Sequence, residues 1–198
     1  MALISKIKGT NGTEYNVRDD VSVWGGRNLI KNSNFNNDIA YWTENKNSSN
    51  TVIEIIKENN KNWLHIVSNN SIQSQQYYDG VNQVINFNNN NDLVTVSFLA
   101  KGSINNVPLY IGFAMYNTDD NVTIVDKTIN LTTTVSKYWF IQSLSNYSST
   151  DLFIGSNSTP IEVWITNIKL EQGTKPTDWS PAPEDIAYVN GECLELLS

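Results

Sequence analysis

Apolar and polar residues alternate along most of this 198-residue chain in short runs, which is the pattern of half-buried β-strands. Polar turns separate the runs, and no segment repeats its apolar residues at the 3.6-residue period of a helix. The predicted strands are residues 51–56, 63–67, 81–87, 93–100, 109–116, 122–129, 138–143, 152–155 and 161–170. Many short strands at this spacing predict an all-β fold, a β-sandwich.

The clearest alternation lies in residues 109–116. Its large apolar positions, which we expect to enter the core, are Leu109, Ile111, Phe113 and Met115. The opposite side of the same strand carries small residues between Tyr110 and Tyr116. That side is predicted to form a shallow trough with aromatic walls.

The two ends of the chain differ from the middle. Residues 3–17 predict a β-hairpin around Asn11-Gly12, since both positions tolerate a positive φ. A lone hairpin buries little, so we expect it to pack on another surface. We therefore divide the chain into an attachment hairpin and hinge at 1–27, a sandwich domain at 28–180, and an extended tail at 181–198. For the residues beyond Ile186, one strand and a short helical turn both remain open.

Composition excludes several classes of function. The net charge is −7 and the few Lys and Arg are scattered, which disfavours binding to nucleic acid or to an anionic membrane. The single cysteine, Cys193, excludes an internal disulfide and a cysteine-based zinc site. No apolar run reaches the ~20 residues of a membrane span, and the first residues lack the pattern of a signal peptide.

A long phrase near the C-terminus resembles a known family. Residues 169–185 read KLEQGTKPTDWSPAPED, in which Gly173 and three prolines end the last strand. This phrase resembles the close of the carbohydrate-binding-module-like jelly rolls in tail-fibre and baseplate proteins from phages of low-GC Gram-positive bacteria. Weaker similarities follow in the expected order, at residues 27–35 with Trp42, 83–85, 94–101 and 137–140.

The resemblance implies a jelly-roll sandwich in a phage or prophage virion component, such as a tail fibre or receptor-binding protein. It would bind host cell-surface polysaccharide without catalysis, as a homotrimer beside other virion proteins, after synthesis in the bacterial cytoplasm. Three alternatives stay open: a purely structural virion subunit, a depolymerase-like glycosidase, and a secreted polysaccharide-binding module.

Sugar recognition requires aromatic rings and side chains that hydrogen-bond hydroxyl groups. Leu64 and Ile66 are predicted to point inward, which places Trp63 and His65 outward. The candidate carbohydrate-binding residues are Trp63, His65, Gln73, Gln75, Tyr77, Tyr110 and Tyr116. The tryptophans within the family-like phrases are interpreted as structural; they are Trp42, Trp139, Trp164 and Trp179.

Neither catalysis nor a bound metal is predicted. His65 is the only histidine and no Gly-x-Ser-x-Gly motif accompanies it, so a serine triad is disfavoured. The resemblance implies a structural calcium near an acidic pair in the last strand, where this chain has Thr166-Asn167. Because neutral side chains replace two carboxylates, we predict no cofactor, and a structural calcium that uses the Asn167 carbonyl oxygen stays as the disfavoured alternative.

Overall fold

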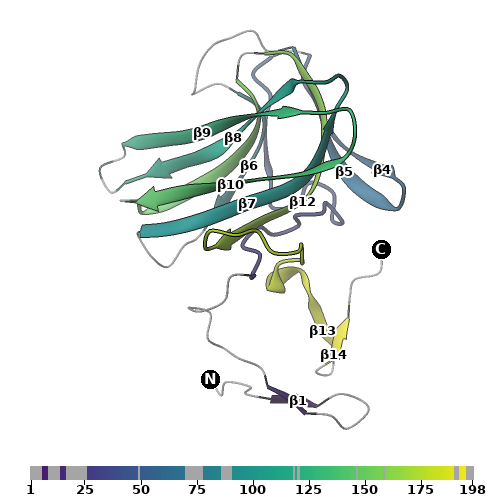
Figure 1. Cartoon of the computed structure of the whole chain (residues 1–198), viewed down its shortest axis with the longest axis vertical. Helices are drawn as coiled ribbons and strands as arrows, with labels where there is room; N and C mark the ends of the chain where they lie inside the picture. The colour runs from purple at the N-terminus through teal and green to yellow at the C-terminus, as the bar shows by residue number, and fades with distance from the viewer. Residues whose placement is uncertain are drawn as a thin grey trace.

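The computed structural model describes residues 6–8, 14–16, 26–48, 50–69, 78–85, 91–117, 119, 121–145, 147–157, 159–189 and 192–194. Two antiparallel five-stranded sheets pack face to face (Figure 1). The first, here called the β7 sheet, has the order β10-β7-β12-β5-β4, and the second, the β8 sheet, has the order β3-β6-β11-β8-β9. The chain is thus an all-β sandwich, as predicted.

The strands of the β7 sheet are β4 (Val52–Glu58), β5 (Lys61–Ser68), β7 (Asn91–Gly102), β10 (Ser136–Ser145) and β12 (Ile161–Gln172). Those of the β8 sheet are β3 (Thr43–Asn45), β6 (Asp79–Ile85), β8 (Val107–Tyr116), β9 (Val122–Leu131) and β11 (Ser149–Ser156). All nine predicted sandwich strands are therefore confirmed, although residues 86–87 of the predicted strand 81–87 lie outside the described residues, and the three-residue β3 was not predicted.

Both terminal regions contain small two-stranded ladders. β1 (Lys6–Lys8) pairs with β2 (Glu14–Asn16), which confirms the predicted hairpin, although its Asn11-Gly12 turn lies outside the described residues. A short 3₁₀ turn, η1 (Pro183–Asp185), precedes β13 (Ala187–Val189), which pairs with β14 (Glu192–Leu194). The segment beyond Ile186 thus holds two paired strands, where one strand or a helical turn was expected. The helical turn lies just before it.

The core lies between the two sheets. The four apolar residues expected to point inward from β8 all belong to it, with exposed fractions between 0% and 6%. They face apolar side chains from the β7 sheet, among them Leu64, Ile66 and Phe98. Within the part of the chain that the structure describes, no helix is long and apolar enough to cross a membrane.

The side chain of Asn28 joins the two family-like phrases. Its amide nitrogen donates to Ser33 Oγ and to the carbonyl oxygens of Ile168 and Ser180, at 2.9–3.0 Å. Its carbonyl oxygen accepts from the backbone of Ile30 and of Leu170. Asn28 is fully buried. Its one amide therefore connects residues 28–41, here called the N-terminal turn, with the last strand and the exit segment.

The exit segment after Gly173 returns over the outer side of the β7 sheet. There Lys169 and Glu171 are almost completely buried. Glu171 accepts from the backbone and the hydroxyl of Thr177, at 2.8 and 2.7 Å. Lys169 donates to Thr177 Oγ1 and to the carbonyl of Asp178, each at 2.7 Å. These bonds explain the KLE and T-D-W elements of the C-terminal phrase as one structural unit.

Candidate functional site

The structure distributes the predicted site residues over two opposite faces. Tyr110 and Tyr116 lie on β8 and point away from the core, on the outer face of the β8 sheet. Trp63 and His65 lie on β5, on the outer face of the β7 sheet. The other three candidates, Gln73, Gln75 and Tyr77, lie outside the described residues. The described candidates therefore do not form one site, and their ligand roles stay predictions.

His65 is held by its neighbours on the β7 sheet. Its ring stacks on Trp164 at a centroid distance of 4.7 Å. Its two ring nitrogens lie 3.0 Å from Glu54 Oε1 and 3.4 Å from Glu162 Oε1. The residue is only 8% exposed. These contacts favour a role within the sheet over contact with a ligand.

Trp63 is similarly enclosed, with an exposed fraction of 4%. Its indole nitrogen donates to the carbonyl of Glu58, and the Lys101 ammonium lies 5.9 Å from its ring centroid. Lys101 also lies 5.1 Å from the Trp164 ring centroid and pairs with the Glu58 carboxylate at 2.7 Å. Lys101 and Glu58 therefore cover the two tryptophan rings at this part of the β7 sheet.

The outer face of the β8 sheet has an aromatic floor. Phe153 on β11 lies between Tyr110 and Tyr78, with ring centroids 5.0 and 5.4 Å away. Tyr110 and Phe153 are almost completely buried. The Tyr110 hydroxyl donates to Asp126 Oδ2 at 3.0 Å. Tyr110 therefore forms part of the floor and not the wall of an open trough, because its neighbours cover it.

A polar network crosses the same face. Asn45 on β3 donates to Asn82 Oδ1 at 2.8 Å and to the hydroxyl of Tyr78 at 2.9 Å. Asn82 on β6 donates to Asp151 Oδ2 at 3.1 Å, and the Tyr116 hydroxyl lies 3.5 Å from the same oxygen. All five side chains are half-buried, so they are fixed in place yet accessible. We call this set the β8-face network.

The ionisable groups of the β8-face network have shifted pKa values. Burial raises the pKa of Asp151, while hydrogen bonds from Asn82 and Tyr116 partly oppose the shift. Burial, followed by the nearby Asp151, raises the pKa of Tyr116 and of Tyr78. The phenols consequently remain protonated hydrogen-bond donors at neutral pH, beside an acceptor that is poorly solvated.

Glycines lie in this sheet where neighbouring strands approach closely. Gly80 and Gly155 are direct cross-strand partners, and a Cβ on either would collide with the backbone of the other strand. A Cβ on Gly112, the cross-strand partner of Phe153, would collide with the backbone of Val125 and Asp126. The close pairing of these strands therefore depends on the absence of a side chain at the three glycines.

The face continues into a pocket of about 260 Å³ at its β3–β6 edge, which it reaches through Thr43 and Val84. There Tyr41 is 59% exposed and adopts a left-handed φ of 71°. Its ring centroid lies 5.4 Å from the Lys31 ammonium. An exposed aromatic ring thus lies at the end of the face. The left-handed backbone conformation of Tyr41 is unusual for a tyrosine, and packing of its side chain into the core does not account for it.

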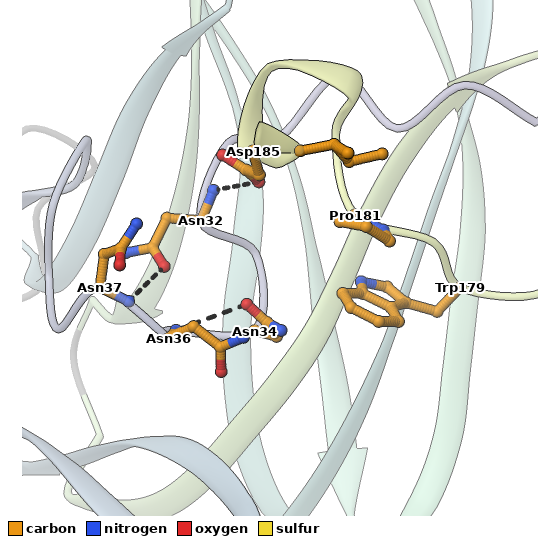
Figure 2. Close-up of a pocket in the computed structure, with 8 residues that line it drawn as sticks. Asn32, Asn34, Asn36, Asn37, Trp179, Pro181 and Asp185 are labelled. Carbon is orange, nitrogen blue, oxygen red and sulfur yellow. Dashed lines mark hydrogen bonds between the residues drawn. The ribbon is translucent and has the colours of Figure 1, made fainter. Parts of the chain in front are cut away.

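A second pocket, of about 220 Å³, lies between the N-terminal turn and the exit segment (Figure 2). Its lining residues are Asn32, Asn34, Asn36, Asn37, Trp179, Pro181, Asp185 and Ile186. Burial raises the pKa of Asp185, although the backbone N–H of Asn32 donates to its carboxylate at 2.7 Å. This pocket was not predicted from the sequence.

Several residues of the β8 face were also missed. Phe153 sits in the apolar run 152–154, where alternation does not identify the outward position. Asn82 and Asp151 occupy polar positions of alternating strands, but their proximity depends on strand pairing. Only the outward polar side of β8 gave a usable signal in the sequence.

The bulge in β12 carries neutral side chains at the position of the implied acidic pair. Asn167 adopts a φ of 52° where the register shifts between Thr166 and Lys169. Neither Thr166 nor Asn167 carries a carboxylate, and the hydroxyl of Thr166 lies 3.5 Å from the Asn167 amide oxygen. Among the described residues, no group of three or more His, Cys, Asp or Glu side chains could hold a metal ion.

Comparisons with known proteins place the fold. No protein-family model matches the sequence, and no curated protein matches it significantly. Among solved structures, the enzymatically active domain of tailspike protein 4 from bacteriophage CBA120 is similar, with a TM-score of 0.58 and 12% identity. That match covers 74% of this chain but 21% of the tailspike chain.

Two smaller proteins match over their full length or nearly so. A putative sugar-binding protein from Bacteroides thetaiotaomicron has a TM-score of 0.58 at 13% identity, over 74% of this chain and 100% of its own. A family 16 carbohydrate-binding module has a TM-score of 0.51 at 12% identity, over 72% and 99%. The chain therefore has the jelly-roll sandwich fold of carbohydrate-binding modules, which confirms the predicted fold class.

Proposed function

We propose that this chain is a phage or prophage virion component, a tail-fibre or receptor-binding protein, that binds host cell-surface polysaccharide without catalysis. The β8-face network is the observation that carries the proposal. It presents two phenols, two carboxamides and a carboxylate on one sheet face, with fixed mutual positions. A polysaccharide offers this surface many hydroxyl groups and the apolar faces of its rings.

Tyr116 and Tyr78 are the half-buried aromatic side chains that a sugar ring could reach on this face. Asn82 and Asp151 would bond hydroxyl groups, and their existing contacts limit the entropy lost on binding. A single shallow site of this kind binds weakly. We propose that copies in a homotrimer reinforce one another, because linked sites gain avidity without new contacts.

Two observations support the virion assignment. The phrases at residues 27–35 and 169–185, through which the chain resembles phage tail proteins, meet in space at Asn28. The sandwich is also similar in fold to part of a phage tailspike. Location on a tail or other surface appendage, beside other virion proteins, is part of the proposal.

The experiment compares binding of purified wild-type protein and two variants to cell-wall polysaccharide from low-GC Gram-positive hosts. Tyr116→Ala removes an accessible ring from the β8 face. Trp139→Ala is the matched control, because Trp139 is a 51% exposed aromatic residue on the outer face of the other sheet. Thermal unfolding verifies that both variants fold, and an assay for new reducing ends tests for catalysis.

We expect saturable binding that Tyr116→Ala weakens about tenfold and Trp139→Ala leaves unchanged, without release of reducing ends. Equal losses in both variants, or none in either, would contradict binding at the β8 face. New reducing ends would replace the proposal with a depolymerase.

A structural subunit without sugar binding is the second candidate, favoured by exposed apolar residues on the β7 sheet. Leu93 and Trp139 are each about half exposed, and Ile141 is 37% exposed. In this alternative they would contact another virion subunit. An intact oligomer that Trp139→Ala dissociates, and that binds no wall polysaccharide, would support it.

A further inference from the structure

We propose that the pocket between the N-terminal turn and the exit segment binds one sugar ring, as a second carbohydrate site separate from the β8 face. This inference rests on the proposed function in that it takes the chain as a carbohydrate-binding protein. It adds a site of different shape, an open pocket with two facing walls, suited to a terminal residue or a branch of a glycan.

The two sides of the pocket differ in chemistry. Figure 2 shows the asparagines on one side, Trp179 and Pro181 opposite them, and Asp185 at one end. An apolar ring wall opposite a polar wall matches a pyranose, which has an apolar face and a rim of hydroxyl groups. At about 220 Å³ the pocket is smaller than the roughly 300 Å³ at which sites for drug-sized ligands begin, so it suits a single ring.

Hydrogen bonds hold the polar side in shape. Asn32 donates through its amide to the carbonyls of Asp38 and Ala40, each at 3.0 Å, and accepts from the backbone of Asn37 at 3.1 Å. Its own backbone donates to Asp185. Asn32 is buried and fully engaged, so it shapes the pocket and leaves recognition to other side chains.

The indole opposite is fixed as well, because Trp179 Nε1 donates to the buried Ser33 Oγ at 3.1 Å. The Ser33 hydroxyl also accepts from the Asn28 amide. Trp179 is therefore linked through Ser33 to the residue that joins the last strand to the exit segment. The pocket therefore exists before a ligand arrives, and little ordering cost remains to be met on binding.

Polar groups without partners line the polar side. Among the described residues, the Asn37 carboxamide makes no hydrogen bond. Asn34 and Asn36 accept through Oδ1, from the Asn36 backbone and from Asn62 Nδ2, and their amide donors have no partner in the described chain. Carboxamides that can both donate and accept are the groups that recognise sugar hydroxyls.

The experiment records ¹H–¹⁵N spectra of the full chain while monosaccharides are added. The probes are neutral hexoses, N-acetylhexosamines and a complete acid hydrolysate of the wall polysaccharide used above. The indole N–H of Trp179 reports on the pocket, and its signal is assigned with Trp179→Phe. The test variant is Asn37→Ala, which keeps the backbone bond from Asn37 to Asn32, and the matched control is the exposed Asn50→Ala.

We expect a saturable shift of the Trp179 signal with at least one sugar, about tenfold weaker binding in Asn37→Ala, and no change in Asn50→Ala. A Trp179 signal that no sugar moves, or equal affinity in both variants, would overturn the pocket. Tyr116→Ala separates the two proposals. If the β8 face binds polysaccharide, Tyr116→Ala weakens that binding and leaves the Trp179 shift intact. If only the pocket proposal fails, no sugar shifts the Trp179 signal and polysaccharide still binds at the β8 face.

Discussion

The outer faces of the two sheets share one core but differ in what covers them. On the β7 sheet the chain supplies its own cover, since the exit segment lies over Lys169 and Glu171 and charged residues enclose Trp63 and His65. On the β8 sheet the polar side chains bond to one another and remain partly exposed. The alternation that identifies core residues therefore says little about function. The polar and aromatic side chains that differ between the two sheets lie on their outer faces, which the core does not determine.

The contrast also separates stability from recognition. Contacts around the β7 sheet and its exit segment join different parts of the chain backbone, both nearby, as in Glu171 to Thr177, and 140 residues apart, as in Asn28 to Ile168. Contacts on the β8 face join side chains of neighbouring strands that already pair. Substitutions on the first face should mainly alter folding, and those on the second should mainly alter binding.

The largest expected effect comes from Asn28→Ala. It deletes five hydrogen bonds, four of them buried, and leaves backbone groups of β12 without partners. We expect the free energy of unfolding to fall by about 4 kcal/mol, measured by urea denaturation. Asn50→Ala, at an exposed turn, is the control and should change it by less than about 0.5 kcal/mol. A similar small change for both would show that Asn28 does not hold the exit segment.

Glu171→Gln should have the next largest effect, because it leaves the buried Lys169 ammonium, 3.8 Å away, without its counter-charge. Burial lowers the pKa of Lys169 and the Glu171 carboxylate opposes that shift. We expect a loss of about 3 kcal/mol in unfolding free energy. The double variant Lys169→Met/Glu171→Gln should regain part of it, and a double variant less stable than the single one would argue against a coupled pair.

Asp151→Asn should affect binding more than stability. Burial raises the pKa of this carboxyl, so between its ordinary pKa near 3.8 and the raised value the folded state holds more protons than the unfolded state. Wild-type stability then falls as pH rises through that window, and the neutral variant lacks this loss. Urea denaturation should show the variant gaining stability relative to wild type between pH 3 and pH 7, while polysaccharide binding weakens about tenfold. An unchanged difference across this range would show that the carboxyl is not destabilised by burial.

The smallest effect is expected for Trp139→Ser on the β7 sheet. Its half-exposed ring should contribute less than about 1 kcal/mol to the stability of the monomer, and polysaccharide binding should not change. Sedimentation velocity tests the rest of the comparison. A shift to smaller species would mean that this exposed face is covered by another copy.

The alternation of apolar residues was sufficient to predict the sandwich strands, because burial on one side imposes a period of two. It also predicted the core face of β8. The pattern did not predict β3, whose residues Thr43, Glu44 and Asn45 are all polar and are recruited by pairing with β6.

The candidate site was only partly accessible from the sequence. Alternation separates inward from outward positions but does not assign a strand to a sheet, so Trp63 and Tyr110 were grouped although they lie on opposite faces. The contact of Asn82 with Asp151 depends on the pairing of β6 with β11. The pocket beside Trp179 requires segments 146 residues apart, bridged by the bond from Trp179 to Ser33.

The opposed glycines of the β8 sheet have a consequence for how such a protein could acquire a new ligand. Gly80, Gly112 and Gly155 are excluded from variation, since any side chain there would separate the strands. A change of ligand would therefore have to be encoded at bordering positions on the same face, such as Val84, Tyr116 and Ile124. Directed evolution of new specificities should begin with a library restricted to those positions, over an invariant glycine centre.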